Sequence, residues 1–174
     1  MTQSAHHSEQ TIHATCIAMA RGLPGWFGFG ATGVLLLGPS GSGKSDLALR
    51  LLQRGARMVA DDRVVLTERN GRLTASPPEN LQGMIEVRGV GVLPCRWQAR
   101  TRVVLAAKLN PGAKIERLPD PLDQFEYGAT RIPMIEIDPF HASAPAKVET
   151  ALMAARRLAR LPESPLPAVQ GALS

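Results

Sequence analysis

Residues 38–45 read Gly-Pro-Ser-Gly-Ser-Gly-Lys-Ser, which matches the phosphate-binding loop pattern of a glycine, four free positions and then Gly-Lys-Ser. Glycines in such a loop let the backbone turn its N–H groups toward a polyphosphate. Lys44 would place a compact positive charge on the β- and γ-phosphates, and the Ser45 hydroxyl would bind Mg²⁺. We therefore predict that the residues of this loop that bind nucleotide are Gly38, Pro39, Ser40, Gly41, Ser42, Gly43, Lys44 and Ser45.

The segments on either side of the loop fit this interpretation. Residues 34–37 form a continuous apolar run, as expected of a buried parallel strand. After the loop, leucines and an alanine recur at helical spacing up to Gly55, which would end a helix. The alternative is a Gly/Ser-rich turn that matches the pattern by chance, and it does not account for a strand, a lysine and a helix in this order.

Two adjacent carboxylates, Asp61 and Asp62, follow the next predicted strand, residues 57–60. Strand ends carry the ligand crevice in α/β sheets, so these carboxylates should face the bound phosphates. Phosphoryl transfer needs a metal ion that neutralises the phosphates and a group that receives the proton of the attacking hydroxyl. Asp61 and Asp62 could divide these two roles. The alternative is a strand end with two hydrated carboxylates.

Further candidates are less specific. Glu86 and Arg88 alternate in a predicted strand over residues 85–93 and so would point to one face, and the glycines that follow suggest the close approach of a ligand. A charged pair on a solvated face beside a bulge is an equally good interpretation. His13 is a lone histidine among apolar residues, and Arg117 is one arginine among many. Composition alone selects neither of them.

The remaining elements predict an α/β fold, a mixed sheet that carries the phosphate loop and has flanking helices. We expect further strands over residues 11–20, 64–66, 73–75, 102–109 and 132–137, a long loop over residues 119–128, and a hairpin turn at Asn70-Gly71. A last helix would begin after Ser143, with Pro145 in its first turn and arginines on a solvated face. Residues 1–10 and 161–174 should be disordered, leaving one domain over residues 11–160.

Composition narrows the functional class. The chain has 174 residues and a net charge of +5, which favours phosphorylated or acidic partners. Aromatic residues are only 4% and the basic residues are scattered, so nucleic-acid binding is not expected. Apolar runs are too short for a membrane span, and the polar start does not resemble a signal peptide, which predicts a cytoplasmic protein. Cys16 and Cys95 should be reduced core residues.

Three stretches in order, the phosphate loop, Val-Ala-Asp-Asp and Ile-Glu-Val-Arg-Gly-Val-Gly-Val, resemble the catalytic domain of the HPr kinase/phosphorylase family. The similarity runs over about residues 13–117, and the Glu-Val-Arg-Gly-Val-Gly stretch is the most specific part. The chain is similar to a short form without the N-terminal regulatory domain of longer members. It also departs from the family in a longer connection before the loop and in the segment after Arg131, which the family ties to dephosphorylation.

The resemblance implies a kinase that uses ATP, or also pyrophosphate, with Mg²⁺ to phosphorylate a serine of the HPr carrier protein, and that reverses this by phosphorolysis. Family members are typically hexamers. By position, Asp62 would accept the serine proton, and Ser45 and Glu86 would hold the metal. The residues assigned to catalysis are His13, Lys44, Asp62, Arg88 and Arg117. The residues assigned to the metal are Ser45, Asp61 and Glu86.

Two other functions remain open at this point. A small-molecule kinase would use the same phosphate loop, with residues 119–128 as a lid. A nucleotide-sensing interaction protein would bind nucleotide without transferring phosphate. The presence of Asp61, Asp62 and Glu86 together argues against pure binding, because binding alone does not require three such carboxylates.

Overall fold

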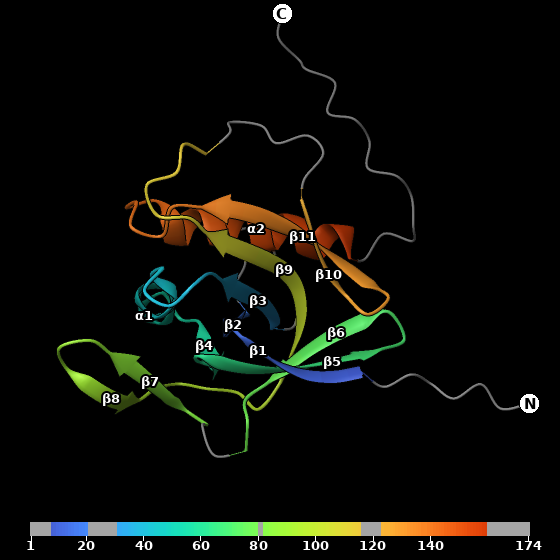
Figure 1. Cartoon of the computed structure of the whole chain (residues 1–174), viewed down its shortest axis with the longest axis horizontal. Helices are drawn as coiled ribbons and strands as arrows, with labels where there is room; N and C mark the ends of the chain where they lie inside the picture. Colours follow the sequence, from blue (N-terminus) through green and yellow to red (C-terminus); the bar gives the residue numbers. More distant parts are fainter. Residues whose placement is uncertain (1–7, 21–30, 80–81, 116–122, 160–174) are drawn as a thin grey trace, which may run out of the picture.

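The computed structural model describes residues 8–20, 31–79, 82–115 and 123–159. In this part of the chain a nine-stranded mixed sheet carries two helices on one face, and a separate hairpin packs beside the first helix (Figure 1). The strands of the sheet are β1 (Ser8–His13), β2 (Thr15–Met19), β3 (Thr32–Leu37), β4 (Arg57–Ala60), β5 (Arg63–Arg69), β6 (Arg72–Ser76), β9 (Thr101–Leu109), β10 (Gln124–Tyr127) and β11 (Thr130–Ile137). The hairpin consists of β7 (Met84–Val87) and β8 (Gly91–Pro94), and the helices are α1 (Lys44–Gln53) and α2 (Ala144–Leu158). The predicted fold class is confirmed.

Strand β9 organises the sheet because it pairs with three other strands. On one side it runs parallel to β3. On its other side, the start of β9 pairs antiparallel with β6 and its end pairs parallel with β11. The sheet therefore continues in the order β1-β5-β6-β9-β3-β2-β4, with the β10–β11 hairpin attached to the end of β9. The phosphate-loop strand β3 is thus central, with β9 and β2 as its neighbours.

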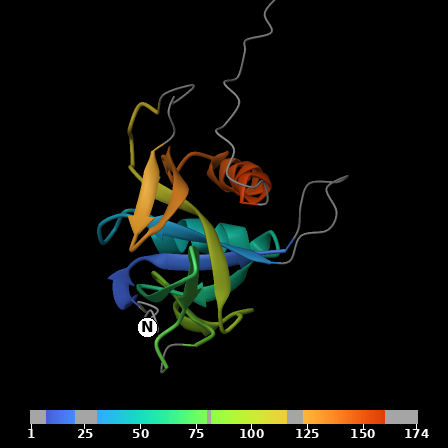
Figure 2. The same ribbon diagram turned by 90° about the vertical axis from the view of Figure 1, so that its right-hand side faces the viewer.

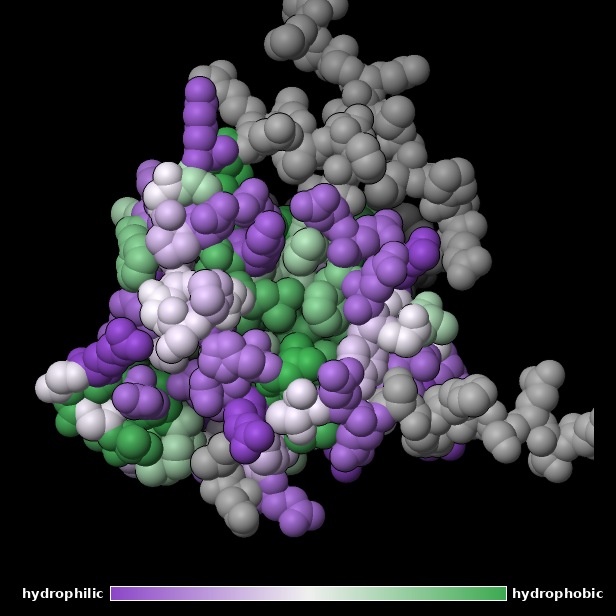
Figure 3. Space-filling view, viewed as in Figure 1, coloured by the Kyte–Doolittle hydropathy of each residue, from purple (hydrophilic) through white to green (hydrophobic). Residues whose placement is uncertain are grey.

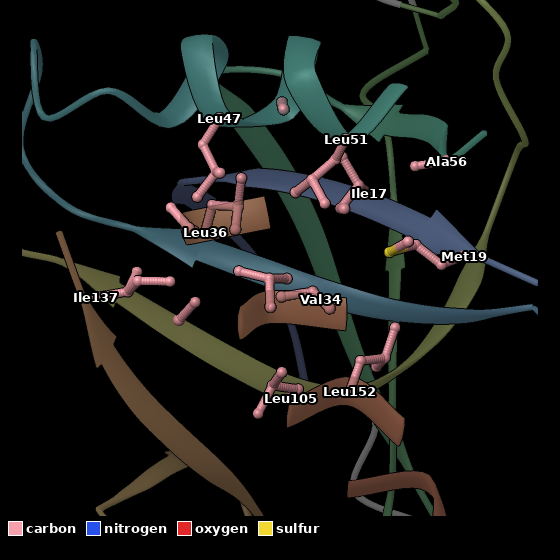
Figure 4. Packing of buried hydrophobic residues seen from close by; sticks show 14 of the residues in the cluster. Ile17, Met19, Val34, Leu36, Leu47, Leu51, Ala56, Leu105, Ile137 and Leu152 are labelled. Carbon is pink, nitrogen blue, oxygen red and sulfur yellow. The ribbon is translucent and has the colours of Figure 1, made fainter. Parts of the chain in front are cut away.

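The core consists of two clusters on opposite faces of the sheet. On one face, leucines of α1 and α2 such as Leu47 and Leu152 pack against Val34 and Leu36 of β3 and Ile17 of β2 (Figure 4). Figure 2, a view along α2, shows this helix on one side of the strands. The second cluster contains no residue of either helix and consists of residues of the sheet strands together with Ala14, which lies between β1 and β2. The sheet therefore curls over its own second face, and the helices cover the first.

Local sequence explains how α1 is placed. It begins at Lys44, directly after the loop, and its Leu47, Ala48 and Leu51 are buried on the core face. Gly55 ends the helix with a φ of 98°, and its N–H donates to the carbonyl of Leu52. The predicted order of strand, loop and helix is confirmed.

The predicted strand over residues 11–20 is interrupted. It forms two strands, because β1 pairs with β5 while β2 pairs with β3 and β4, and the chain changes partners at Ala14. The N–H of Ala14 donates instead to the carbonyl of Asp62 at 3.2 Å. β1 also begins at Ser8, so residues 8–10 belong to the sheet and not to a disordered terminus. Residues 1–7 and 160–174 lie outside the described residues.

Two other segments differ from expectation. Residues 85–93 form the β7–β8 hairpin and not one strand, because the chain reverses at Arg88, Gly89 and Val90, where Gly89 has a φ of 80°. Residues 124–127, expected in a loop, form β10 because they pair with β11. The hairpin turn at Asn70-Gly71 between β5 and β6 is confirmed.

Helix α2 confirms Ser143 at the cap position and a proline in the first turn, although the Ser143 side chain makes no capping hydrogen bond. The prediction of a solvated arginine face is wrong for Arg156, which is 3% exposed. Its guanidinium donates to the carbonyl of Met19 and to Thr32 Oγ1, which are paired across β2 and β3. Burial lowers the pKa of Arg156. This arginine therefore joins α2 to the ends of two sheet strands.

Among the described residues, no helix is long and apolar enough to cross a membrane.

Candidate functional site

One pocket of about 410 Å³ brings most of the predicted site residues together. It lies where the phosphate loop and the start of α1 meet the end of β1, the residues after β4 and the β7–β8 hairpin. The predicted residues that line it are His13, Ser40, Gly41, Gly43, Lys44, Ser45, Asp61, Asp62, Glu86 and Arg88. Segments from four regions of the chain therefore converge on the loop.

The phosphate loop has the backbone that its sequence predicts. Gly41 and Gly43 have φ values of 80° and 88°, in the left-handed region that favours glycine. Gly43 is the cap of α1, so the positive end of the helix dipole opens into the pocket. Ser42 is 3% exposed, and its hydroxyl has no partner among the described residues. This backbone suits an anion, and the direct role of the loop residues 38–45 in binding nucleotide stays a prediction.

Lys44 is nearly buried and its three N–H donors have three acceptors. Its Nζ donates to the carbonyls of Gly38 at 2.8 Å and Pro39 at 2.9 Å, and it lies 3.0 Å from His13 Nε2. Burial lowers the pKa of Lys44, while the negative charges of Asp62 and Asp61 act in the opposite direction. The lysine is therefore held between its own loop and the acidic side of the pocket.

His13 connects Lys44 to Asp62. Its Nδ1 lies 3.0 Å from Asp62 Oδ1 and 3.1 Å from the Asp62 carbonyl, and its Nε2 faces Lys44. Because the ammonium of Lys44 can only donate, Nε2 accepts and Nδ1 carries the proton that it donates to Asp62. Residues from β1, α1 and the segment after β4 thus form one continuous chain of hydrogen bonds.

Asp62 combines an exposed carboxylate with an uncommon backbone. Its φ is 65°, which is rare for a residue other than glycine, and its side chain is 72% exposed. Its carbonyl is held by Ala14 N–H, so the contact at the strand interruption supports this conformation. The carboxylate is therefore fixed by its backbone and by His13 while it remains accessible from solvent.

Asp61 lies beside Ser45, the other residue of the loop side that is predicted to bind the metal. Its Oδ1 accepts hydrogen bonds from Thr15 Oγ1 at 2.8 Å, from Ser45 Oγ at 3.2 Å and from the N–H of Asp62 at 3.1 Å. A carboxylate beside a loop serine fits Mg²⁺, which takes few protein ligands together with phosphate oxygens and water. Within the described ranges no group of three or more His, Cys, Asp or Glu side chains forms a closed metal site. The donors present suit a metal that arrives with phosphates.

The remaining predicted residues differ in their placement. Glu86 lines the pocket from β7, and Arg88 lines it from the turn of the hairpin. Arg117 lies outside the described residues, so its role stays a prediction. Sequence reasoning missed Thr15, which holds Asp61, and Phe140, which lines the pocket after β11. The end of β11 could have pointed to Phe140, because β3, β9 and β11 run parallel and end at the same edge of the sheet.

Comparisons with known proteins show which family this chain resembles. A family model described as HPr Serine kinase C-terminal domain matches residues 27–160. The HPr kinase/phosphorylase of Clostridium tetani is 51% identical over 61 residues, and that of Brevibacillus brevis is 50% identical over 62 residues. Each of these matches covers 35% of this chain and 20% of the relative, so the chain aligns with about a fifth of the length of these relatives.

A solved structure is similar over most of the chain. The Hpr(Ser) kinase/phosphatase from Coxiella burnetii has a TM-score of 0.69 at 26% sequence identity, over 86% of this chain and 92% of that chain. The similar structure, the similar sequences and the family model therefore all belong to HPr kinases. The family model also matches residues beyond 117, where the resemblance of the sequence motifs ends. The chain belongs to the HPr serine kinase C-terminal domain family.

Proposed function

We propose that this chain is an ATP- and Mg²⁺-dependent protein-serine kinase that acts on an HPr-like phosphocarrier protein, and that it can also remove the phosphoryl group by phosphorolysis. The relatives named HPr kinase/phosphorylase support the substrate class. The observation that carries the proposal is the hydrogen-bonded chain Lys44, His13 and Asp62 beside the pair Ser45 and Asp61, all in one pocket. A cytoplasmic location and assembly into hexamers are carried over from the sequence and the family resemblance.

The protein would bind the donor through its loop. The loop N–H groups and Lys44 would hold the phosphates, and Ser45 with Asp61 would hold the metal, with Glu86 on the facing hairpin. When bound, Mg²⁺ neutralises the charge of the β- and γ-phosphates. Phosphates that approach Lys44 would compete with the carbonyls of Gly38 and Pro39 for its N–H donors. Pyrophosphate can use the same contacts, since they involve phosphate oxygens alone.

Asp62 would receive the proton of the acceptor serine. In the forward reaction the serine oxygen bonds to the γ-phosphorus, the bond from that phosphorus to the β,γ-bridging oxygen breaks, ADP leaves, and the serine proton passes to the Asp62 carboxylate. In phosphorolysis an oxygen of inorganic phosphate bonds to the phosphoserine phosphorus, the bond from that phosphorus to the serine oxygen breaks, the serine oxygen takes the proton of Asp62, and pyrophosphate leaves. His13 Nδ1–H orients the carboxylate in both directions.

A protein acceptor fits the rim of the pocket better than a metabolite does. The β7–β8 hairpin, which contributes Glu86 and Arg88 to the pocket, also exposes Met84, Val90, Val92 and Leu93. The green area at the lower left of Figure 3 marks this apolar part of the surface. A contiguous apolar area beside a reaction site is typical of a surface that a macromolecule covers. The lid expected of a small-molecule kinase would fall partly on residues 116–122, outside the described residues.

Mass spectrometry of candidate carriers tests the proposal. We expect incubation of an HPr-like protein with the purified chain, ATP and Mg²⁺ to add one phosphoryl group on serine, and excess inorganic phosphate to remove it with release of pyrophosphate. Phosphorylation of metabolites but not of carrier proteins would favour the small-molecule kinase. Nucleotide binding without any phosphorylated product would favour the sensing protein.

The variant Asp62→Asn tests whether Asp62 receives the serine proton. We expect it to phosphorylate the carrier roughly 10² to 10⁴ times more slowly than the unaltered protein, as is typical when a general base is lost. The control is Asp123→Asn, the same chemical change at an exposed carboxylate that does not line the pocket. Full activity of Asp62→Asn would show that the proton passes elsewhere.

A further inference from the structure

An aromatic ring lies at the rim of the phosphate pocket with no evident structural reason for its exposure. Phe140 follows β11 and lines the pocket, and it is 59% exposed. It belongs to neither core cluster of the described residues. Among the described residues that line the pocket, Phe140 is the only Phe, Tyr or Trp, and the other ring, the imidazole of His13, is already held between Lys44 and Asp62. The phosphate chemistry assigned above does not use this ring.

The ring has a defined position relative to the phosphate loop. A Cβ atom added at Gly43 would lie 3.1 Å from Phe140 Cζ and 3.0 Å from Pro139 Cγ, so the turn after β11 packs directly on the loop. Gly43 is the cap of α1, where the phosphates are expected. Phe140 therefore lies beside the anion site and not merely on the same surface.

Hydrogen bonds hold the turn that presents the ring. Asp138 Oδ1 accepts from the N–H of Phe140 at 3.0 Å, and Asp138 Oδ2 accepts from the N–H of Gly112 at 3.2 Å. Arg50 of α1 donates to the carbonyls of Pro139 and His141. The turn is thus tied to α1 and to the segment after β9. A ring presented on a fixed turn loses little conformational freedom when a ligand covers it.

We propose that Phe140 is the platform on which the base of a nucleotide donor stacks. This rests on the proposed function, because it presupposes that the loop binds the phosphates of the donor. Phosphate groups gain nothing from an apolar ring, whereas a purine base has a flat π-face that stacks on an aromatic side chain. The adjoining loop then fixes the phosphates, and Phe140 distinguishes a nucleotide from inorganic pyrophosphate.

Isothermal titration calorimetry tests this proposal. The unaltered protein and each variant are titrated with ADP and, separately, with pyrophosphate, in both cases with Mg²⁺. Stacking of a base on an aromatic side chain corresponds to about 5- to 150-fold in affinity, so we expect Phe140→Ala to weaken ADP binding within this range. Pyrophosphate affinity should not change, since the substitution removes no contact to the phosphates. Phe140→Trp should retain ADP affinity because it keeps a π-face. Trp97→Ala, at an exposed aromatic residue that does not line the pocket, is the control and should change neither affinity.

The outcomes separate this proposal from the proposed function. Unchanged ADP affinity in Phe140→Ala would overturn the stacking role while the phosphate site stands. An equal loss of ADP and pyrophosphate would also overturn it, because the ring would then only support the loop. If the unaltered protein bound neither ligand, the phosphate site itself would be wrong, and the stacking role would fall with it.

Discussion

Lys44 Nζ and His13 Nε2 lie 3.0 Å apart, although the two residues are separated by 31 positions in the chain and come from α1 and β1. This contact joins the phosphate side of the pocket to Asp62, since His13 also contacts that carboxylate. A phosphate loop by itself binds nucleotide. Its connection to an exposed acid is what makes phosphoryl transfer to an external hydroxyl the best account of this site.

Burial of Lys44 should appear in the pH dependence of stability. The pKa of Lys44 is lowered from its ordinary value of 10.5, so the folded protein holds this proton less tightly than the unfolded chain does. Between the lowered pKa and 10.5 the unfolded state binds more protons, and the free energy of unfolding contributed by Lys44 therefore rises with pH across this window.

The variant Lys44→Met isolates this contribution. We expect the difference in free energy of unfolding, unaltered protein minus Lys44→Met, to increase as the pH is raised from 7 toward 10.5 in denaturant titrations without ligand. The subtraction removes the other groups that titrate in this range. A difference that stayed constant or decreased would contradict a lowered pKa for this lysine.

Thr15 should control the metal through Asp61. Thr15 is fully buried, and its hydroxyl donates to the same Oδ1 that accepts from Ser45. Thr15→Val keeps the shape and removes the donor, which leaves the carboxylate less firmly oriented. We expect the Mg²⁺ concentration for half-maximal activity to rise about 10- to 100-fold, as is typical when a partner of a metal ligand is removed.

Thr101→Val provides the matched control for that experiment. Thr101 is 4% exposed, and its hydroxyl has no hydrogen-bond partner among the described residues. The same substitution there should leave the Mg²⁺ requirement unchanged. An equal shift in both variants would mean that the effect comes from general destabilisation and not from Asp61.

Arg156 should matter for folding and not for chemistry. Its contacts to the Met19 carbonyl and Thr32 Oγ1 join α2 to β2 and β3, and Arg156 does not line the pocket. Arg156→Met would leave two polar groups without their donor, and we expect a loss of roughly 1–3 kcal/mol in the free energy of unfolding by chemical denaturation. The rate constant for phosphoryl transfer should be unchanged at temperatures where the variant is folded.

The exposed Lys147 on the same helix offers a comparison for Arg156. Lys147→Met removes a positive charge from α2 without breaking a buried contact, and it should change the free energy of unfolding by no more than about 0.5 kcal/mol. Equal destabilisation by both substitutions would indicate that helix charge, and not the buried contact, is the cause.

The parts of this protein that the sequence predicts are those that depend on neighbours in the chain. The strand, loop and helix around Lys44 follow from glycine positions and apolar periodicity over some twenty residues. The placement of Asp62 after the next strand follows from the same order of elements. The resemblance to a family added the roles of Glu86 and His13, which composition alone did not select.

Other features depend on contacts between distant segments and could not be predicted. The interruption at Ala14 arises because β1 and β2 pair with different strands. The apolar alternation around Arg88 predicts one strand because it continues through the hairpin turn, and only the pairing of β7 with β8 reveals the reversal. Arg156 has the sequence signature of an exposed helix arginine, and its burial depends on where α2 crosses β2 and β3.

The interruption at Ala14 has a consequence for how this site can vary. The residue before Ala14, His13, contacts Asp62, and the residue after it, Thr15, contacts Asp61. The two segments therefore meet in opposite sequence order. One alignment of two short segments thus sets both the orientation of Asp62, the proposed proton acceptor, and that of Asp61, the proposed metal ligand. Inserting or deleting a single residue in either segment would shift both contacts at once, so a change in length at this place would alter both proposed roles together.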